Sequence, residues 1–293
     1  MKESTHRISE RTRSAHLLLA AAAMVLVGTS ARCEPVPHRV VSMNLCTDQL
    51  AMLVAAENQL YAVSHLASDP EASVLAADAK RFATNHGLAE EIFMMRPDLV
   101  LAGTFTNRAS VAMLRRLGLR VEEFAPSTSL AEIKDQIRRM GALFGRQQHA
   151  EELVTEFERS LAAVPSELQS RPLAALYYAN SYTSGSSTLA AEVVAQAGLE
   201  NLGTRLGLKG AVRLPLEMIV MAAPELVVGG ERTGTSPTLA YQTFDHPALR
   251  AILNGRDLTA VPDKYWICGG PFTTEAVRLL ATTSRNIAEH RRP

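Results

Sequence analysis

LAEEIFMMRPDLVLAG (residues 88–103) has a similar counterpart later in this chain, PLEMIVMAAPELVVGG (residues 215–230). Seven of the sixteen positions carry the same residue in both copies. We interpret the segment as one structural unit used twice, which indicates two similar lobes. The identical pairs are Glu90/Glu217, Ile92/Ile219, Met94/Met221, Pro97/Pro224, Leu99/Leu226, Val100/Val227 and Gly103/Gly230.

Each copy predicts a short helix followed directly by a strand. The residue before a proline is disfavoured in the α region, so each helix should end near Arg96 or Ala223. The sequences PDLVLAG and PELVVGG come next and end in glycine. Short runs of leucine and valine of this kind are typical of a parallel strand that is covered on both faces.

A glutamate lies seven residues before the proline of each copy, at Glu90 and Glu217. This position falls in the first turn of the predicted helix, where a carboxylate is stabilised by the positive end of the helix dipole. From the residues alone, we interpret both glutamates as first-turn acids on a solvated face.

Length and composition allow two domains. A chain of 293 residues with 47% hydrophobic residues can fill two cores of ~100–150 residues each. The net charge is zero and no basic run follows the first residues. We therefore expect no nucleic-acid partner.

The amino-terminal residues predict an export signal. A basic start is followed by an apolar run at 17–27 and small residues at 29–31, so we expect a signal peptide over residues 1–31. The apolar run is shorter than the ~20 residues that span a bilayer, so the mature protein is expected to be soluble and periplasmic. Cys33 leaves a lipid anchor open, although Arg32 before it does not match the small residue at such sites.

Two further cysteines, Cys46 and Cys268, lie in the two predicted lobes. An exported protein meets conditions in which disulfides form. The pair is either bridged, present as free thiols that face a ligand, or buried as two unrelated small residues, and the sequence leaves all three open.

Strands and helices alternate along the rest of the chain, which predicts an α/β fold with a mainly parallel sheet in each lobe. Candidate strands lie at 39–43, 60–64, 97–103, 119–124, 173–179, 224–230 and 258–262. Candidate helices lie at 47–56, 107–117, after Ser129, and at 147–164, 187–197, 247–253 and from Thr273. Ligands bind beyond the carboxyl ends of such strands. The loops expected to line a site in the first lobe are 44–48, 65–69, 84–87 and 103–107.

Residues 147–164 predict one long helix midway between the two copies of the repeat. Its apolar residues are spaced by three and four, at Ala150, Leu153, Phe157, Leu161 and Val164. We interpret it as a rigid connection between the lobes. The expected domains are an amino-terminal lobe at 38–145, the interlobe helix at 146–165 and a carboxyl-terminal lobe at 172–293.

These features resemble the helical-backbone, or class III, substrate-binding proteins of ABC importers, over residues 38–290. Tyr182-Thr183-Ser184-Gly185 and Leu199-Glu200-Asn201 are most similar to motifs of the vitamin B12-binding branch. The resemblance implies a periplasmic, monomeric carrier with no catalytic activity and no cofactor. It also implies that Glu90 and Glu217 dock on arginines of the membrane permease.

The resemblance further implies that a metal chelate binds between the lobes. Tyr182 and Trp266 lie where the family places ring contacts, and Phe105 lies on a cleft loop. The tryptophan that the B12-binding branch carries before its docking helix is replaced here by Asn85-His86. Cobalamin, haem and ferric siderophores therefore all remain candidate ligands.

Polar and sulfur-containing residues complete the candidate site. Arg232, like Arg108, follows a cleft loop and would pair with an anionic chelate. Direct metal binding by His65, His86 and Cys46 is an alternative, and a thiol redox enzyme that uses Cys46 and Cys268 is another. The chain has no CxxC, GxSxG or phosphate-loop motif that would favour an enzyme. The full set of candidate ligand-binding residues is Asn44, Cys46, His65, His86, Phe105, Tyr182, Arg232, Trp266 and Cys268.

Overall fold

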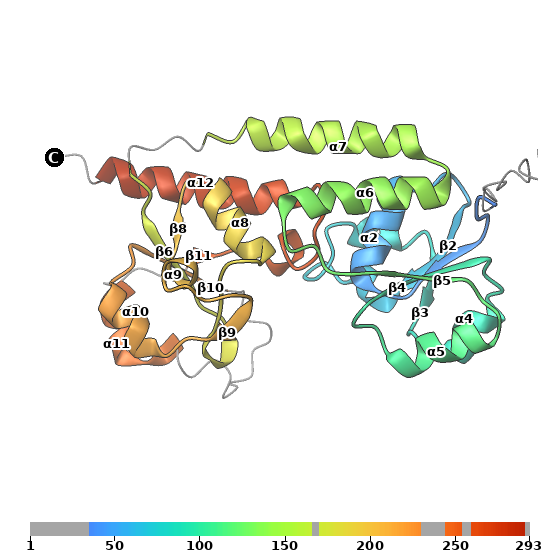
Figure 1. Ribbon diagram of the computed structural model, residues 1–293, viewed down its shortest axis with the longest axis horizontal. Helices are drawn as coiled ribbons and strands as arrows, with labels where there is room; N and C mark the ends of the chain where they lie inside the picture. The colour runs from blue at the N-terminus through green and yellow to red at the C-terminus, as the bar shows by residue number, and fades with distance from the viewer. Residues whose placement is uncertain (1–34, 166–169, 230–243, 254–258, 291–293) are drawn as a thin grey trace, which may run out of the picture. The chain divides into compact units, whose positions relative to one another are not determined.

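The computed structural model describes residues 35–165, 170–229, 244–253 and 259–290 (Figure 1). The predicted export signal, Cys33 and Arg232 lie outside these ranges. Among the described residues, no helix is both long enough and apolar enough to cross a membrane.

The first half of the described chain forms a five-stranded sheet in which every pairing is parallel, with the order β3-β2-β1-β4-β5. Its strands are β1 (Val40–Ser42), β2 (Leu60–Ser64), β3 (Ala83–Asn85), β4 (Leu99–Gly103) and β5 (Val121–Phe124). The connecting helices are α2 (Leu45–Val54), the 3-10 turn His65–Ser68, α3 (Ala76–Ala79), α4 (Ala89–Met94) and α5 (Arg108–Arg116). The predicted alternation of strand and helix is confirmed for this lobe.

The second half forms a four-stranded parallel sheet with the order β11-β10-β6-β8, together with an antiparallel pair, β7 and β9. The strands are β6 (Leu173–Leu176), β7 (Tyr182–Ser184), β8 (Glu200–Asn201), β9 (Ala211–Arg213), β10 (Leu226–Gly229) and β11 (Thr259–Ala260). The helices are α8 (Leu189–Gln196), α9 (Leu202–Arg205), α10 (Leu216–Ala222), α11 (Pro247–Leu253) and α12 (Thr273–His290), with 3-10 turns at Ala179–Ser181 and Asp263–Tyr265.

Two long helices, α6 (Leu130–Phe144) and α7 (Gln147–Ala162), lead from the first sheet to the second (Figure 1). Ser129 caps α6, since its hydroxyl accepts a hydrogen bond from the Glu132 amide at 3.0 Å. Gly145 ends α6 with a φ of 66°, in the left-handed region. Gly141 allows α6 and α7 to approach closely, because a Cβ atom there would lie 2.4 Å from the Cβ of Ala150.

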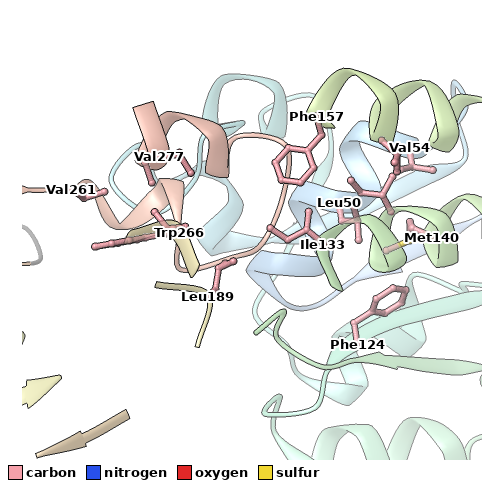
Figure 2. Close-up of a cluster of buried hydrophobic side chains, with 14 of the residues drawn as sticks. Leu50, Val54, Phe124, Ile133, Met140, Phe157, Leu189, Val261, Trp266 and Val277 are labelled. Atoms are coloured by element: carbon pink, nitrogen blue, oxygen red, sulfur yellow. The ribbon is translucent and has the colours of Figure 1, made fainter. Parts of the chain in front are cut away.

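One hydrophobic cluster runs through both halves and through the long helices. Figure 2 shows Leu50, Ile133 and Phe157 on one side of this cluster and Leu189 and Val277 on the other. Two smaller clusters each belong to one lobe. The two lobes therefore share one hydrophobic core, which includes buried residues of α6 and α7.

The doubled segment has the same structure in both copies: α4 leads into β4, and α10 leads into β10. Ile92 and Ile219 are both fully buried and anchor the two helices. The helices end where the prolines predict, with positive φ values of 50° at Arg96 and 44° at Ala223. The two-lobed α/β fold class is confirmed.

Several local predictions were wrong. The expected loop at 84–87 overlaps the end of β3, and β7, α9 and β9 were not among the candidate strands and helices. Each of the three strands, β3, β7 and β9, has only three residues, which is too short to show an alternating apolar pattern, and each depends on pairing with a neighbour. The helix expected at 47–56 begins two residues earlier, at Leu45, because Asn44 caps it: its Oδ1 accepts from the Cys46 amide at 3.0 Å.

Candidate ligand-binding cleft

The predicted lining loops of the first lobe lie at one edge of its sheet, where the strands have their carboxyl ends. Because all pairings in this sheet are parallel, the residues that follow β1, β2, β3 and β4 emerge on the same side. These residues include Asn44, His65, His86 and Phe105. The predicted first-lobe residues therefore lie along one edge.

A small pocket of about 80 Å³ opens at this edge. Among its lining residues are Asn44, Cys46, Thr104, Phe105, Ser127 and Gly269. Gly269 comes from the segment before α12, so the pocket joins the two halves of the chain. Its volume is well below the ~300–1,000 Å³ of ordinary small-molecule sites.

Asn44 and Phe105 have different roles at this pocket. Asn44 caps α2 and lies against β4, where an added Cβ on Gly103 would lie 2.9 Å from the Asn44 amide nitrogen. Gly103, which belongs to the doubled segment, is therefore needed for this contact. Phe105 is almost fully exposed and presents an aromatic ring to solvent at the mouth.

Cys46 and Cys268 form a disulfide that spans 222 residues of sequence. Cys46 is the second residue of α2 and is half-buried, whereas Cys268 is buried. The first of the three alternatives left open by the sequence is therefore confirmed. A bridged sulfur offers no thiolate, so Cys46 is not available as a soft metal ligand in this structure.

His65 and His86 are brought together, with their rings stacked at a centroid distance of 5.2 Å and an interplanar angle of 21°. Both side chains are exposed. The Nδ1 of His86 lies 3.2 Å from Oε1 of Glu91, and the His86 amide donates to the same carboxylate at 2.7 Å. In the described part of the chain, no three histidine, cysteine or acidic side chains gather in an arrangement that would hold a metal ion.

The two second-lobe aromatic residues differ in exposure. Tyr182 is exposed, with the Arg213 guanidinium 5.8 Å from its ring centroid. Trp266 is only 8% exposed and lies edge-on to Tyr178 at 6.3 Å, and it belongs to the buried cluster that Figure 2 shows. Tyr182 is open to solvent but does not line the pocket described above, whereas the ring of Trp266 is packed in the core and is not presented to a ligand.

Sequence reasoning missed part of the lining. Ser127 and its neighbours directly follow β5, so the strand-end rule that found the other loops would also have found them. No sequence pattern could have predicted that Gly269 and Gln136 line the pocket, because they reach it only through the packing of α6 and of the segment before α12.

Glu90 and Glu217 are both exposed, one on α4 and one on α10. Neither carboxylate has a hydrogen-bond or ion-pair partner within the ranges that the structure describes. They occupy equivalent positions of the doubled segment, and Figure 1 shows their helices, α4 and α10, in separate lobes. Two accessible, unpaired charges are thus displayed at matched sites.

Comparisons with known proteins find relatives of this chain by sequence and by structure. A cobalamin-binding protein of Halobacterium salinarum is 26% identical over 210 residues, which are 69% of this chain and 56% of that protein. The match therefore spans about half the length of that relative. The periplasmic heme-binding protein RhuT from Roseiflexus sp. RS-1, in apo form, has a TM-score of 0.71 at 20% identity, over 86% of this chain and 99% of that chain.

The periplasmic vitamin B12 binding protein BtuF of Vibrio cholerae has a TM-score of 0.63 at 18% identity, over 87% of this chain and 99% of that chain. At these identities the two structures show a shared fold. A family model described as periplasmic binding protein matches residues 40–256. This match covers most of the chain, and the protein belongs to the periplasmic binding protein family.

Proposed function

We propose that the protein is the substrate-binding component of an ABC importer, that it works in the periplasm as a monomer, and that it carries a metal chelate. The observation that carries this proposal is the doubled segment, which presents an exposed, unpaired glutamate from each of two lobes. Exposed carboxylates orient a carrier on a cationic permease surface and raise the rate of encounter. The predicted signal peptide accounts for export.

The class of ligand follows from the site and from the relatives. Phe105 and Tyr182 are exposed aromatic rings, which suit a flat macrocycle or a chelate with apolar faces. Proteins of this fold are named for binding cobalamin and heme. We therefore place cobalamin, haem and ferric siderophores in the same ligand class for this chain.

Titration of the mature protein, residues 32–293, tests the ligand class. Cyanocobalamin, haemin and a ferric hydroxamate siderophore are added separately, and binding is followed by calorimetry. We expect one of them to bind with a Kd in the micromolar range or tighter. Failure of all three to bind would overturn the chelate proposal.

Replacing Phe105 or Tyr182 by serine is expected to weaken binding of that ligand by about five- to tenfold, because each loses an aromatic contact. Phe93→Ser is the matched control, since Phe93 is also exposed but lies on α4. Equal affinity in Phe105→Ser, Tyr182→Ser and the control would exclude both aromatic residues from the site.

Direct metal binding is the second candidate, favoured by the stacked His65 and His86. It predicts that Zn²⁺ or Ni²⁺ alone binds the purified protein and that His65→Ala abolishes binding. A chelate carrier would show neither effect. The thiol redox alternative is disfavoured, because the family is one of binding proteins and Cys268 is buried.

The docking role predicts a charge-dependent interaction. Glu90→Gln with Glu217→Gln should reduce saturable binding of the mature protein to spheroplasts by at least tenfold at low salt, and the loss should shrink at high salt. Glu152→Gln is the control, because Glu152 is an exposed acid on α7. Unchanged binding of the double variant would remove the docking role.

A further inference from the structure

Helices α4 and α10 each expose apolar side chains beside the glutamate, Glu90 or Glu217. We define the first tip as Glu90, Phe93 and Met94, and the second tip as Glu217, Val220 and Met221. Phe93 and Val220, which occupy equivalent positions, are 42% and 39% exposed. Met94 and Met221, also equivalent, are 77% and 80% exposed. The two lobes thus repeat the chemistry of the tip and also its degree of exposure.

Helical spacing places these residues together. Within each helix, the methionine follows the glutamate by four positions and therefore lies beside it on the same face. Ile92 and Ile219 lie on the opposite face and are fully buried in their lobes. The buried isoleucine fixes the helix, so the glutamate and the methionine both point outward in each copy.

Single exposed apolar residues are common and need no explanation. Here, however, methionine recurs at the same position of a repeated segment in which nine of sixteen residues differ between the copies. Each methionine lies one turn from an acid that has no partner among the described residues. An acid and an apolar side chain displayed together, twice, fit a surface that offers a cation next to an apolar recess.

We propose that Met94 and Met221 insert into apolar recesses of the membrane permease, beside the cationic groups that receive Glu90 and Glu217. This inference rests on the proposed function. The glutamates set orientation and encounter rate, whereas burial of the methionines slows dissociation. Methionine suits this role because its unbranched side chain adapts to an irregular recess.

Binding of the mature protein to spheroplasts tests the inference, with an amino-terminal fluorophore as the label. Met94→Gln and Met221→Gln are each expected to weaken binding by about tenfold, and the double variant by more. Met113→Gln, a change at an exposed methionine on α5, is the matched control and should bind normally. Chelate affinity should be unchanged in all variants.

Salt separates the two contributions. The loss caused by the methionine changes should persist at 1 M salt, because apolar burial is not screened, whereas the loss caused by Glu90→Gln and Glu217→Gln should shrink. If the glutamate variants lose binding and the methionine variants do not, this inference fails and the docking role stands. If neither set loses binding, both fail.

A photo-crosslinker confirms the partner. Benzophenone-phenylalanine placed at position 94 or 221 is activated on spheroplasts, and the product is identified by mass spectrometry. A crosslink from both positions to the permease subunit of an ABC importer supports the inference. Crosslinks to other proteins, or none from either position, overturn it.

Discussion

Replacing Cys46 and Cys268 together by alanine is expected to lower the free energy of unfolding by about 5 kcal/mol. The bridge closes a loop across 222 residues of sequence, and the entropy that a cross-link removes from the unfolded chain grows with the logarithm of loop length. For a chain of this size, the midpoint of thermal unfolding should fall by about 10–20 °C.

Calorimetry of the wild-type protein with and without a reductant measures the same effect without a mutation. Cys46→Ala alone and Cys268→Ala alone should each lose nearly as much as the double variant, because either change breaks the same bond. The double variant is the control for the reductant, which should not affect it further. A reductant that leaves the wild-type midpoint unchanged would contradict the prediction.

Unfolding without the bridge should remain a single transition. The largest hydrophobic cluster includes residues of both lobes, such as Leu50 and Val277. Two hydrogen bonds also join the halves: the Leu130 amide donates to Glu192 at 2.7 Å, and Lys264 donates to the Pro70 carbonyl at 3.1 Å. The disulfide therefore stabilises a unit that the core already holds together.

The parts of the fold that the sequence predicted well are those that bury an apolar pattern. The strand at 60–64 and the helix at 247–253 match the structure residue for residue, and the last helix begins at Thr273 as expected. The doubled segment made it possible to predict the fold class, because its apolar run and its proline together mark the junction of helix and strand.

The missed elements have a different physical origin. β7 and β9 hold each other through antiparallel pairing between Tyr182 and Arg213 and their neighbours, and this pairing leaves no periodic pattern in either strand. The disulfide could not be chosen from sequence, since its two cysteines are 222 residues apart and come together through the packing of the folded chain. Trp266 likewise became a core residue because of how the segment before α12 packs.

Asp48 predicts an unusual dependence of stability on pH. Its carboxylate is fully buried near the start of α2, and burial raises its pKa from the ordinary value of 3.8 to about 7. A hydrogen bond from the Ser64 hydroxyl to Oδ2, at 2.5 Å, opposes this shift only in part. The other oxygen, Oδ1, has no hydrogen-bond partner in the described structure.

Between about pH 4 and pH 7, the folded protein therefore holds a proton on Asp48 that the unfolded chain has released. The free energy of unfolding should fall as the pH rises through this window, by about 4 kcal/mol in total, and stay at the lower value above it. Most buried carboxylates with charged partners have the opposite trend, because their pKa is lowered. This site thus favours the folded state in mildly acidic conditions.

Asp48→Asn removes the titrating group and keeps an oxygen that accepts from Ser64. Denaturant unfolding at a series of pH values should show that this variant loses the decline between pH 4 and 7 and exceeds the wild-type protein in stability at pH 8. Asp135→Asn, at an exposed carboxylate on α6, should keep the decline. A decline that persists in Asp48→Asn would contradict the prediction, because the proton would then be carried by a group other than Asp48.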